Sequence, residues 1–180
     1  TITKQPTNGV LTGTIPNLIY TPNLNYFGTD EIRYRASDGK TTSNEAVISI
    51  TITSVNDVPV LTVPGPQTIV TGQALSFSIS ATDVDSNQAL TLSATNVPAG
   101  ATFQQTNSSS SAAAGVFNWT PTDAQTGSFT VTFTVTDNGL PVLSDNKTVT
   151  IVVNALTTSI AIDAPTERTI NENDTVATDE

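Results

Sequence analysis

The chain has 180 residues, a formal net charge of −10 and no Cys, Met or His. Such a chain lacks the basic surface that nucleic acids and anionic membranes attract, and it lacks the ligands and nucleophiles of thiol, histidine and soft-metal sites. The composition therefore favours an acidic protein that binds hard cations, and nothing in it indicates an enzyme.

Predicted strands follow one another along the whole chain. Val, Ile and Phe alternate with Thr and Ser over residues 46–53, 75–81 and 129–136. That period of two is typical of a strand with one buried face. Ten Gly and ten Pro punctuate the chain, and no stretch has a helical period. The pattern predicts an all-β fold of short antiparallel strands in a sandwich or barrel.

Three dissimilar landmarks recur at one spacing, which indicates an internal repeat. Residues 20–22 match residues 119–121, Gly28 matches Gly127, and Asp38 matches Asp137, each 99 positions apart. We therefore expect residues 1–57 to be the C-terminal portion of one domain and residues 58–154 to be a second copy. We expect residues 155–180 to be a tail or the start of a further repeat. The small-residue run 107–114 is predicted to be a flexible loop tip in the second copy only.

The first copy is expected to lack its N-terminal strands, because nothing in it corresponds to residues 61–71 and 73–81. An incomplete sandwich exposes core residues and unpaired strand edges. One explanation is that the chain is a window from a longer tandem array. The other is that a tail like residues 155–180, with its strand-like segment 159–162, is donated by a neighbouring subunit. Such donation would build a head-to-tail polymer.

Several motifs resemble those of cadherin repeats. Residues 136–144, followed by the alternating segment 149–153, resemble the end of such a repeat, and residues 55–59 resemble the linker between repeats. Asp83-Val84-Asp85 is similar to the Asp-x-Asp of the loop between the second and third strands. The resemblance implies two tandem immunoglobulin-like, cadherin-like β sandwiches, the first lacking its N-terminal strands.

Each copy also resembles a particular variant. Residues 117–121 are similar to dystroglycan-type immunoglobulin-like domains. Residues 20–23, 27–30 and 37–39 are similar to the tandem cadherin-like repeats of large bacterial surface proteins.

The carboxylates of the second copy have no basic neighbours in sequence, since no Lys or Arg lies between Lys40 and Lys147. Carboxylates brought together repel each other, and Ca²⁺ relieves that repulsion in flexible geometry with six to eight oxygen ligands. The alternative is that these Asp and Asn residues are ordinary turn formers. The cadherin resemblance implies a Ca²⁺ site at the junction of the two copies. Its expected ligands are Asn56, Asp57, Asp83, Asp85 and Asp137, with weaker candidates in Asp30 and Glu31. Asp38 is a weaker candidate for a separate metal site that belongs to the first copy.

These features together predict a calcium-rigidified structural or adhesion module of a large secreted or cell-surface protein. Its expected partners are neighbouring repeats or identical subunits, and surface glycans or proteins; we expect no nucleic acid and no membrane insertion in this segment. One alternative is a filament or surface-layer subunit that polymerises by strand donation. The second alternative is a carbohydrate-binding accessory module, which requires Trp119 to be exposed.

Overall fold

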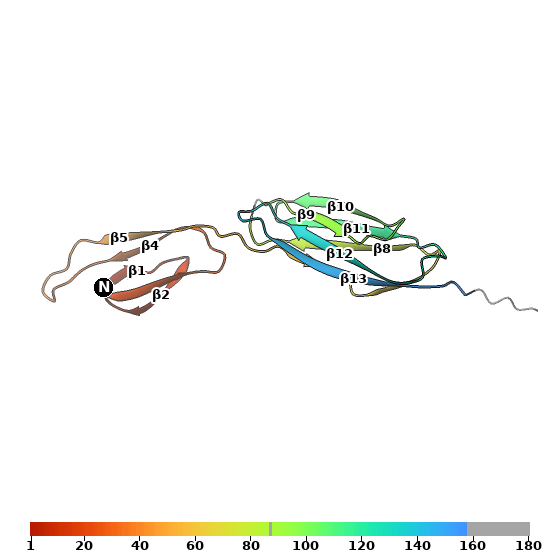
Figure 1. Ribbon diagram of the computed structural model, residues 1–180. Helices are drawn as coiled ribbons and strands as arrows, with labels where there is room; N and C mark the ends of the chain where they lie inside the picture. Colours follow the sequence, from red (N-terminus) through yellow and green to blue (C-terminus); the bar gives the residue numbers. More distant parts are fainter. Residues whose placement is uncertain (87, 158–180) are drawn as a thin grey trace, which may run out of the picture.

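The computed structural model describes residues 1–86 and 88–157, which form thirteen strands in two units that follow one another along the molecule (Figure 1). No helix among these residues is long and apolar enough to cross a membrane. The strands are β1 (Ile2–Lys4), β2 (Gly9–Thr14), β3 (Asn17–Pro22), β4 (Gly28–Tyr34), β5 (Ala46–Ile52), β6 (Val60–Thr62), β7 (Gln67–Val70), β8 (Leu75–Thr82), β9 (Thr91–Thr95), β10 (Thr102–Ser109), β11 (Ala112–Trp119), β12 (Gly127–Thr136) and β13 (Ser144–Asn154).

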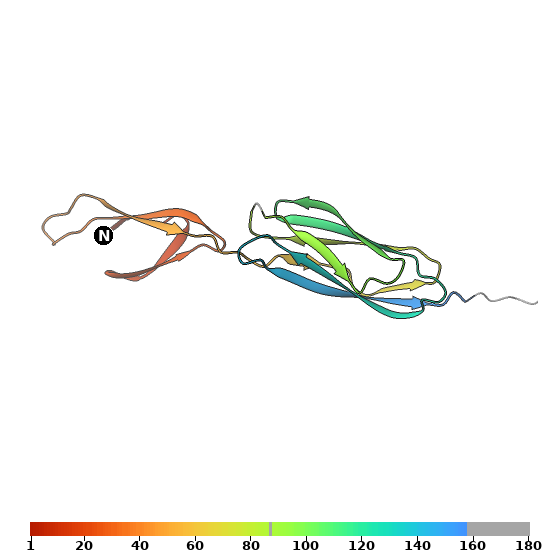
Figure 2. The same ribbon diagram turned by 45° about the horizontal axis from the view of Figure 1, so that its top comes forward.

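The second unit is a sandwich of two four-stranded sheets, with strand orders β10-β11-β8-β6 and β7-β13-β12-β9 (Figure 2). Its neighbouring strands are antiparallel, apart from the parallel pair β7 and β13. The alternating segments of the sequence become β5, β8 and β12, so the expected strand pattern is confirmed. Apolar side chains from both sheets meet between the layers, where aliphatic residues surround a cluster of aromatic rings.

The aromatic cluster of this core centres on Phe117 and Phe133, which are both fully buried. The Phe117 ring stacks on Phe77 with centroids 4.9 Å apart and meets Phe133 edge-on at 6.0 Å. Trp119 is only 2% exposed and meets Phe129 edge-on at 4.9 Å. Offset stacks and edge-to-face pairs are the preferred aromatic geometries, so the two sheets are held together by complementary ring packing.

The first unit contains the same strand pairs in smaller number. Its sheets are β1-β4-β5 and the hairpin β2-β3. The pairs β1–β4, β2–β3 and β4–β5 correspond to β9–β12, β10–β11 and β12–β13 of the second unit. Counterparts of β6, β7 and β8 do not occur among residues 1–57. Within that stretch only Asp30 and Ile32 are buried, so the unit has almost no closed core.

The run 107–114 is not a flexible loop, which corrects the sequence-based expectation. β10 and β11 include all of it except Ser110 and Ser111 at the hairpin turn, with Asn107 opposite Ala114 and Ser109 opposite Ala112. On its other side β11 pairs with β8, and Ala113 is buried opposite Ala81. Pairing on both sides of β11 therefore outweighs the low intrinsic strand propensity of these small residues. The tail segment 159–162 lies outside the described residues.

Candidate functional site at the junction of the two units

The linker after β5 is fastened to the end of the second unit. The Asn56 carboxamide donates to Asp137 Oδ2 and to the carbonyl of Pro141, each at 2.9 Å. The backbone amide of Asp57 donates to Asp85 Oδ2 at 2.7 Å. Through these contacts, residues 56–57 are held by the second unit and should move with it. We call this region, residues 56–57 with 83–86, 88 and 137–143, the seam.

Gly139 allows the linker to lie this close. A Cβ built on Gly139 would overlap the side-chain amide of Asn56. The backbone of Gly139 is not in the left-handed region, so the requirement for glycine here is steric. Any larger residue would push the Asn56 carboxamide away from Asp137 and loosen the seam.

Asp137 also closes the hairpin between β12 and β13. Its Oδ1 accepts hydrogen bonds from the amides of Gly139 at 3.0 Å and Leu143 at 2.9 Å. Asp38 does the same in the first unit, where its Oδ1 accepts from the amides of Lys40 and Thr41. These amide bonds lower the pKa of Asp38 and outweigh the opposite effect of burial. At both repeat positions the turn-forming role of aspartate is therefore present.

Two carboxylates of the seam come from the turn after β8. Asp85 is only 9% exposed, and its amide donates to Asp83 Oδ1 at 2.9 Å. Asp83 Oδ2 is buried without a hydrogen-bond donor in the described part of the chain. The neighbouring Gln88 donates through its Nε2 to Asn56 Oδ1, while its Oε1 is buried and also without a donor. Buried oxygens in this state cost free energy unless something satisfies them.

The seam therefore brings together the five residues predicted from the sequence, but through hydrogen bonds rather than as a compact group of carboxylates. Over residues 1–86 and 88–157, no group of three or more Asp or Glu side chains has the spacing of a metal centre. The donor set that remains is two carboxylates with amide and main-chain oxygens. These are oxygen ligands of the kinds that Ca²⁺ accepts. Gln88 belongs to this set and was missed by the sequence reasoning, because a lone glutamine carries no recognisable motif.

A groove of about 340 Å³ lies beside the seam. It is lined by the turn 22–27 of the first unit, by residues 52–55 of the linker, and by Asp57 and Asp85. No strand of the first unit packs extensively against a strand of the second in the described residues. The angle between the units is therefore not set by a packed apolar interface.

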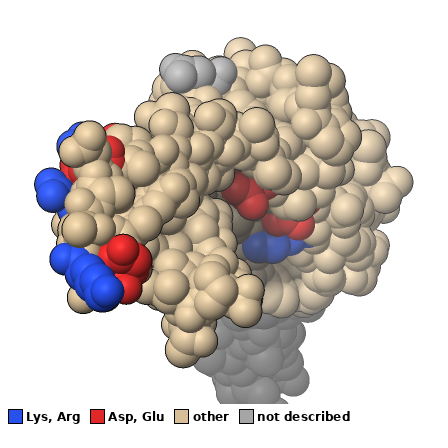
Figure 3. Space-filling model, turned by 90° about the vertical axis from the view of Figure 1, so that its left-hand side faces the viewer, with Lys and Arg blue, Asp and Glu red and all other residues tan. Residues whose placement is uncertain are grey.

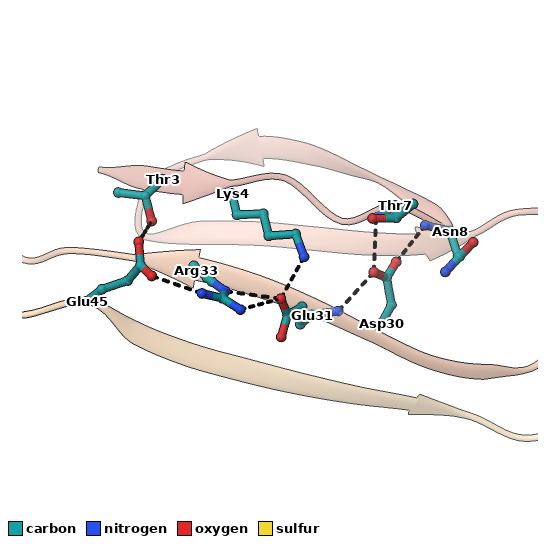
Figure 4. Close-up of polar contacts among 8 residues, drawn as sticks. All are labelled: Thr3, Lys4, Thr7, Asn8, Asp30, Glu31, Arg33 and Glu45. Carbon is teal, nitrogen blue, oxygen red and sulfur yellow. Dashed lines mark hydrogen bonds and ion pairs between the residues drawn. The ribbon is translucent and has the colours of Figure 1, made fainter.

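The weaker candidates are held elsewhere in the first unit. Asp30 accepts hydrogen bonds from the amides of Thr7 at 3.0 Å and Asn8 at 2.8 Å (Figure 4). It also accepts one from the Tyr20 hydroxyl at 3.0 Å. Burial raises the pKa of Asp30, but these bonds and the amide of Glu31 outweigh it and lower the pKa to about 2. Asp30 thus anchors the loop before β2 and is not directed to the seam.

Glu31 lies in a separate ionic cluster on the outer face of the first unit. Lys4 and Arg33 pair with it at 2.6 and 3.0 Å, and Arg33 also reaches Glu45 at 3.3 Å (Figure 4). The hydrogen bonds from Lys4 and Arg33 lower the pKa of Glu31. Asp38 lies in the β4–β5 hairpin, at the end of β5 away from the linker. Asp30 and Glu31 therefore lie outside the seam, where each already has donors of its own, and Asp38 lies in a separate turn of the first unit.

Trp119 faces the core and not solvent. Its ring is 2% exposed, and its Nε1 donates to the carbonyl of Ala99 at 3.3 Å. A sugar cannot stack on a buried indole. The carbohydrate-binding alternative that depended on Trp119 is therefore wrong.

The domain families agree with this architecture. Residues 58–154, more than half of the chain, match the family described as Putative Ig domain. The chain belongs to that family. Residues 1–51 match a second family, described as Bacterial Ig domain. No curated protein matches the chain significantly.

Solved structures show the same fold. Extracellular cadherin domains 3–6 of protocadherin gammaB7 are similar with a TM-score of 0.58 and 20% identity, over 87% of this chain and 40% of that one. Cadherin domains 1–5 of protocadherin gamma B2 give 0.56 and 19%, over 77% and 28%. An endo-fucoidan hydrolase of glycoside hydrolase family 107 covers 87% of this chain and 23% of its own, with 24% identity and a TM-score of 0.45. That likeness is too weak to bear on activity. This chain thus spans less than half of each of these structures.

Proposed function

We propose that this chain is a non-enzymatic spacer module of an extracellular surface protein, in which consecutive immunoglobulin-like units set the distance between the parts they connect. The observation that carries the proposal is the succession of two such units with the linker fastened to the second (Figure 1). The chain has no Cys, Met or His. It therefore lacks side chains that oxidise readily, which suits exposure outside the cell. The partners we propose are neighbouring repeats of the same kind.

We further propose that Ca²⁺ stiffens the linker at the seam. Asp83 and Asp85 would supply carboxylates, and Gln88 would supply its amide oxygen, while Asn56, Asp57 and Asp137 hold the linker beside them. The proposal is supported by the buried oxygens of Asp83 and Gln88, which have no donor among the described residues. It is also supported by the absence of any Lys or Arg from residues 41–146. Ca²⁺ would neutralise the paired carboxylates and satisfy the buried oxygens.

The spacer role and the calcium role are tested separately. Small-angle X-ray scattering of the whole chain measures the maximum dimension with Ca²⁺ and with chelator. We expect an elongated particle in both, with a narrower distribution of dimensions when Ca²⁺ is present. A compact particle under both conditions would contradict the spacer proposal. Identical scattering curves would contradict stiffening by Ca²⁺ while leaving the spacer proposal standing.

The calcium ligands are tested by thermal unfolding followed through Trp119, which is the single Trp of the chain and reports on the second unit. Ca²⁺ should raise the melting temperature, and the double variant Asp83→Asn, Asp85→Asn should lose that rise. Asp123→Asn is the matched control, since Asp123 is exposed in a turn remote from the seam. Equal responses of the two variants, or an equal effect of Mg²⁺, would contradict a specific Ca²⁺ site.

A further inference from the structure

An apolar groove lies between the two sheets of the first unit. Its volume is about 420 Å³, and its lining is mainly uncharged, with Ile2, Ile15, Pro16, Leu18, Tyr34 and Ile48 contributing. Figure 3 views the molecule from this end; most of the surface that it shows is uncharged, and charged side chains gather at one edge and inside the central hollow. The groove occupies the place where the second unit has its core.

The internal repeat allows the two units to be compared position by position. The repeat spacing relates Leu18 to Phe117 and Tyr34 to Phe133. Strand pairing relates Ile48, which lies opposite Ile32, to Val149, which lies opposite Val131. The exposed fraction of each groove residue is far higher than that of its counterpart. The values are 36% for Leu18 against 0% for Phe117, 36% for Tyr34 against 0% for Phe133, and 47% for Ile48 against 1% for Val149. The same core positions are therefore open in one unit and closed in the other.

The closing element in the second unit is β8. It pairs antiparallel with β11, and Phe77 lies opposite Phe117 in that register. The Phe77 ring stacks on Phe117 and also meets Phe133 edge-on at 5.9 Å. In the first unit β3 takes the place of β11, and among the described residues it pairs only with β2. One edge of β3 thus has free backbone donors and acceptors next to an open apolar groove.

We infer that this groove is a strand-acceptor site, which takes an extended polypeptide segment running antiparallel to β3. Its occupant has apolar side chains at every second position, as β8 does with Leu75, Phe77, Ile79 and Ala81 alternating with Ser and Thr. A single strand satisfies both needs at once, because its backbone completes the sheet edge while one face fills the groove. In the register of the second unit, a large apolar side chain of the occupant lies over Leu18 and reaches Tyr34.

The other sheet of the first unit, β1-β4-β5, also has an edge strand without a partner on one side in the described residues. In the second unit β7 pairs in parallel with β13, whereas β5, the counterpart of β13, pairs only with β4 in the described residues. An exposed pair of edges is an aggregation hazard in an isolated unit. The first unit is therefore expected to be much less stable than the second until a strand occupies it.

The test uses the whole chain and a synthetic peptide with the sequence of residues 73–84, which includes β8. All three Tyr residues, Tyr20, Tyr26 and Tyr34, lie in the first unit, and the single Trp lies in the second. Tyrosine near-ultraviolet signals and Trp119 fluorescence therefore follow the two units separately. The peptide should raise the melting temperature of the tyrosine transition as its concentration rises, and leave the Trp119 transition unchanged. Backbone amides of β3 should become protected from hydrogen exchange.

Two controls make the result specific. A peptide with serine in place of Phe77 and Ile79 should not bind, and Leu18→Asp in the protein should weaken binding of the original peptide by at least about tenfold. Because a free peptide of this composition can self-associate, the same segment is also tethered to the chain through a flexible Gly-Ser linker, which raises its effective concentration. Equal binding of the serine peptide would overturn the proposal. So would the absence of any tyrosine shift with both the free and the tethered segment.

Discussion

Replacing Phe117 by alanine should destabilise the second unit far more than the matched change Leu18→Ala destabilises the first. The Phe117 ring is fully buried, stacks on Phe77 at 4.9 Å and meets Phe133 at 6.0 Å. Truncating such a residue removes both ring pairs and leaves a cavity, and it typically costs about 3–5 kcal/mol of unfolding free energy. Leu18 occupies the equivalent position but is 36% exposed, so its truncation should cost below about 1.5 kcal/mol.

Urea unfolding followed by Trp119 fluorescence measures the first of these costs, because Trp119 lies in the same core. The Leu18→Ala variant is its control and should move the Trp119 transition by less than about 0.5 kcal/mol, since distant sites act independently. If Phe117→Ala leaves too little folded protein, Phe117→Leu gives a smaller loss in the same direction. A loss below about 2 kcal/mol for Phe117→Ala would refute the packing argument. A Leu18→Ala shift as large as that of Phe117→Ala would show that the two units unfold as one.

Two further predictions concern single contacts. The low pKa of Asp30, about 2, means that its contribution to the stability of the first unit is complete above the ordinary value of 3.8 and is lost as the pH falls toward 2. Asp30→Asn should therefore lower the tyrosine-reported melting temperature at neutral pH and have no effect near pH 2; a difference that stays constant with pH would contradict this. Gly139→Ala should displace Asn56 and speed proteolysis within residues 53–57, whereas Gly65→Ala, where a Cβ meets nothing within 4 Å, should not.

At one pair of equivalent positions, the two copies use different side-chain interactions. Tyr20 and Asp30 form a hydrogen bond in the first unit. The repeat spacing places Trp119 and Phe129 at the same two positions of the second, where they form an edge-on aromatic pair. A hydrogen-bonded pair tolerates nearby solvent, whereas an aromatic pair gains its free energy from exclusion of water. The hydrogen-bonded pair therefore lies in the first unit, whose core is open, and the aromatic pair lies in the second unit, whose core is closed.

Much of the seam could be predicted from the sequence, but the form of its contacts could not. Asn56, Asp57, Asp83, Asp85 and Asp137 were singled out by motif, and the structure does place them at one end of the second unit. Whether each carboxylate faces a cation or a backbone amide depends on loops that meet only after folding. Asn56 and Asp137 are 81 residues apart, so no local pattern could report that bond.

The amino-acid sequence alone determined the strands and the two-unit organisation, because side-chain alternation and turn residues act over a few neighbouring positions. Gly28 and Gly127 illustrate this, since both open the corresponding strands, β4 and β12, with positive φ angles of 127° and 115°. Only the tertiary structure decided that residues 107–109 and 112–114 belong to strands, and that Leu18 stays open while Phe117 is closed. Each of these outcomes depends on which strand lies across the sandwich, and such long-range pairing leaves no trace in local composition.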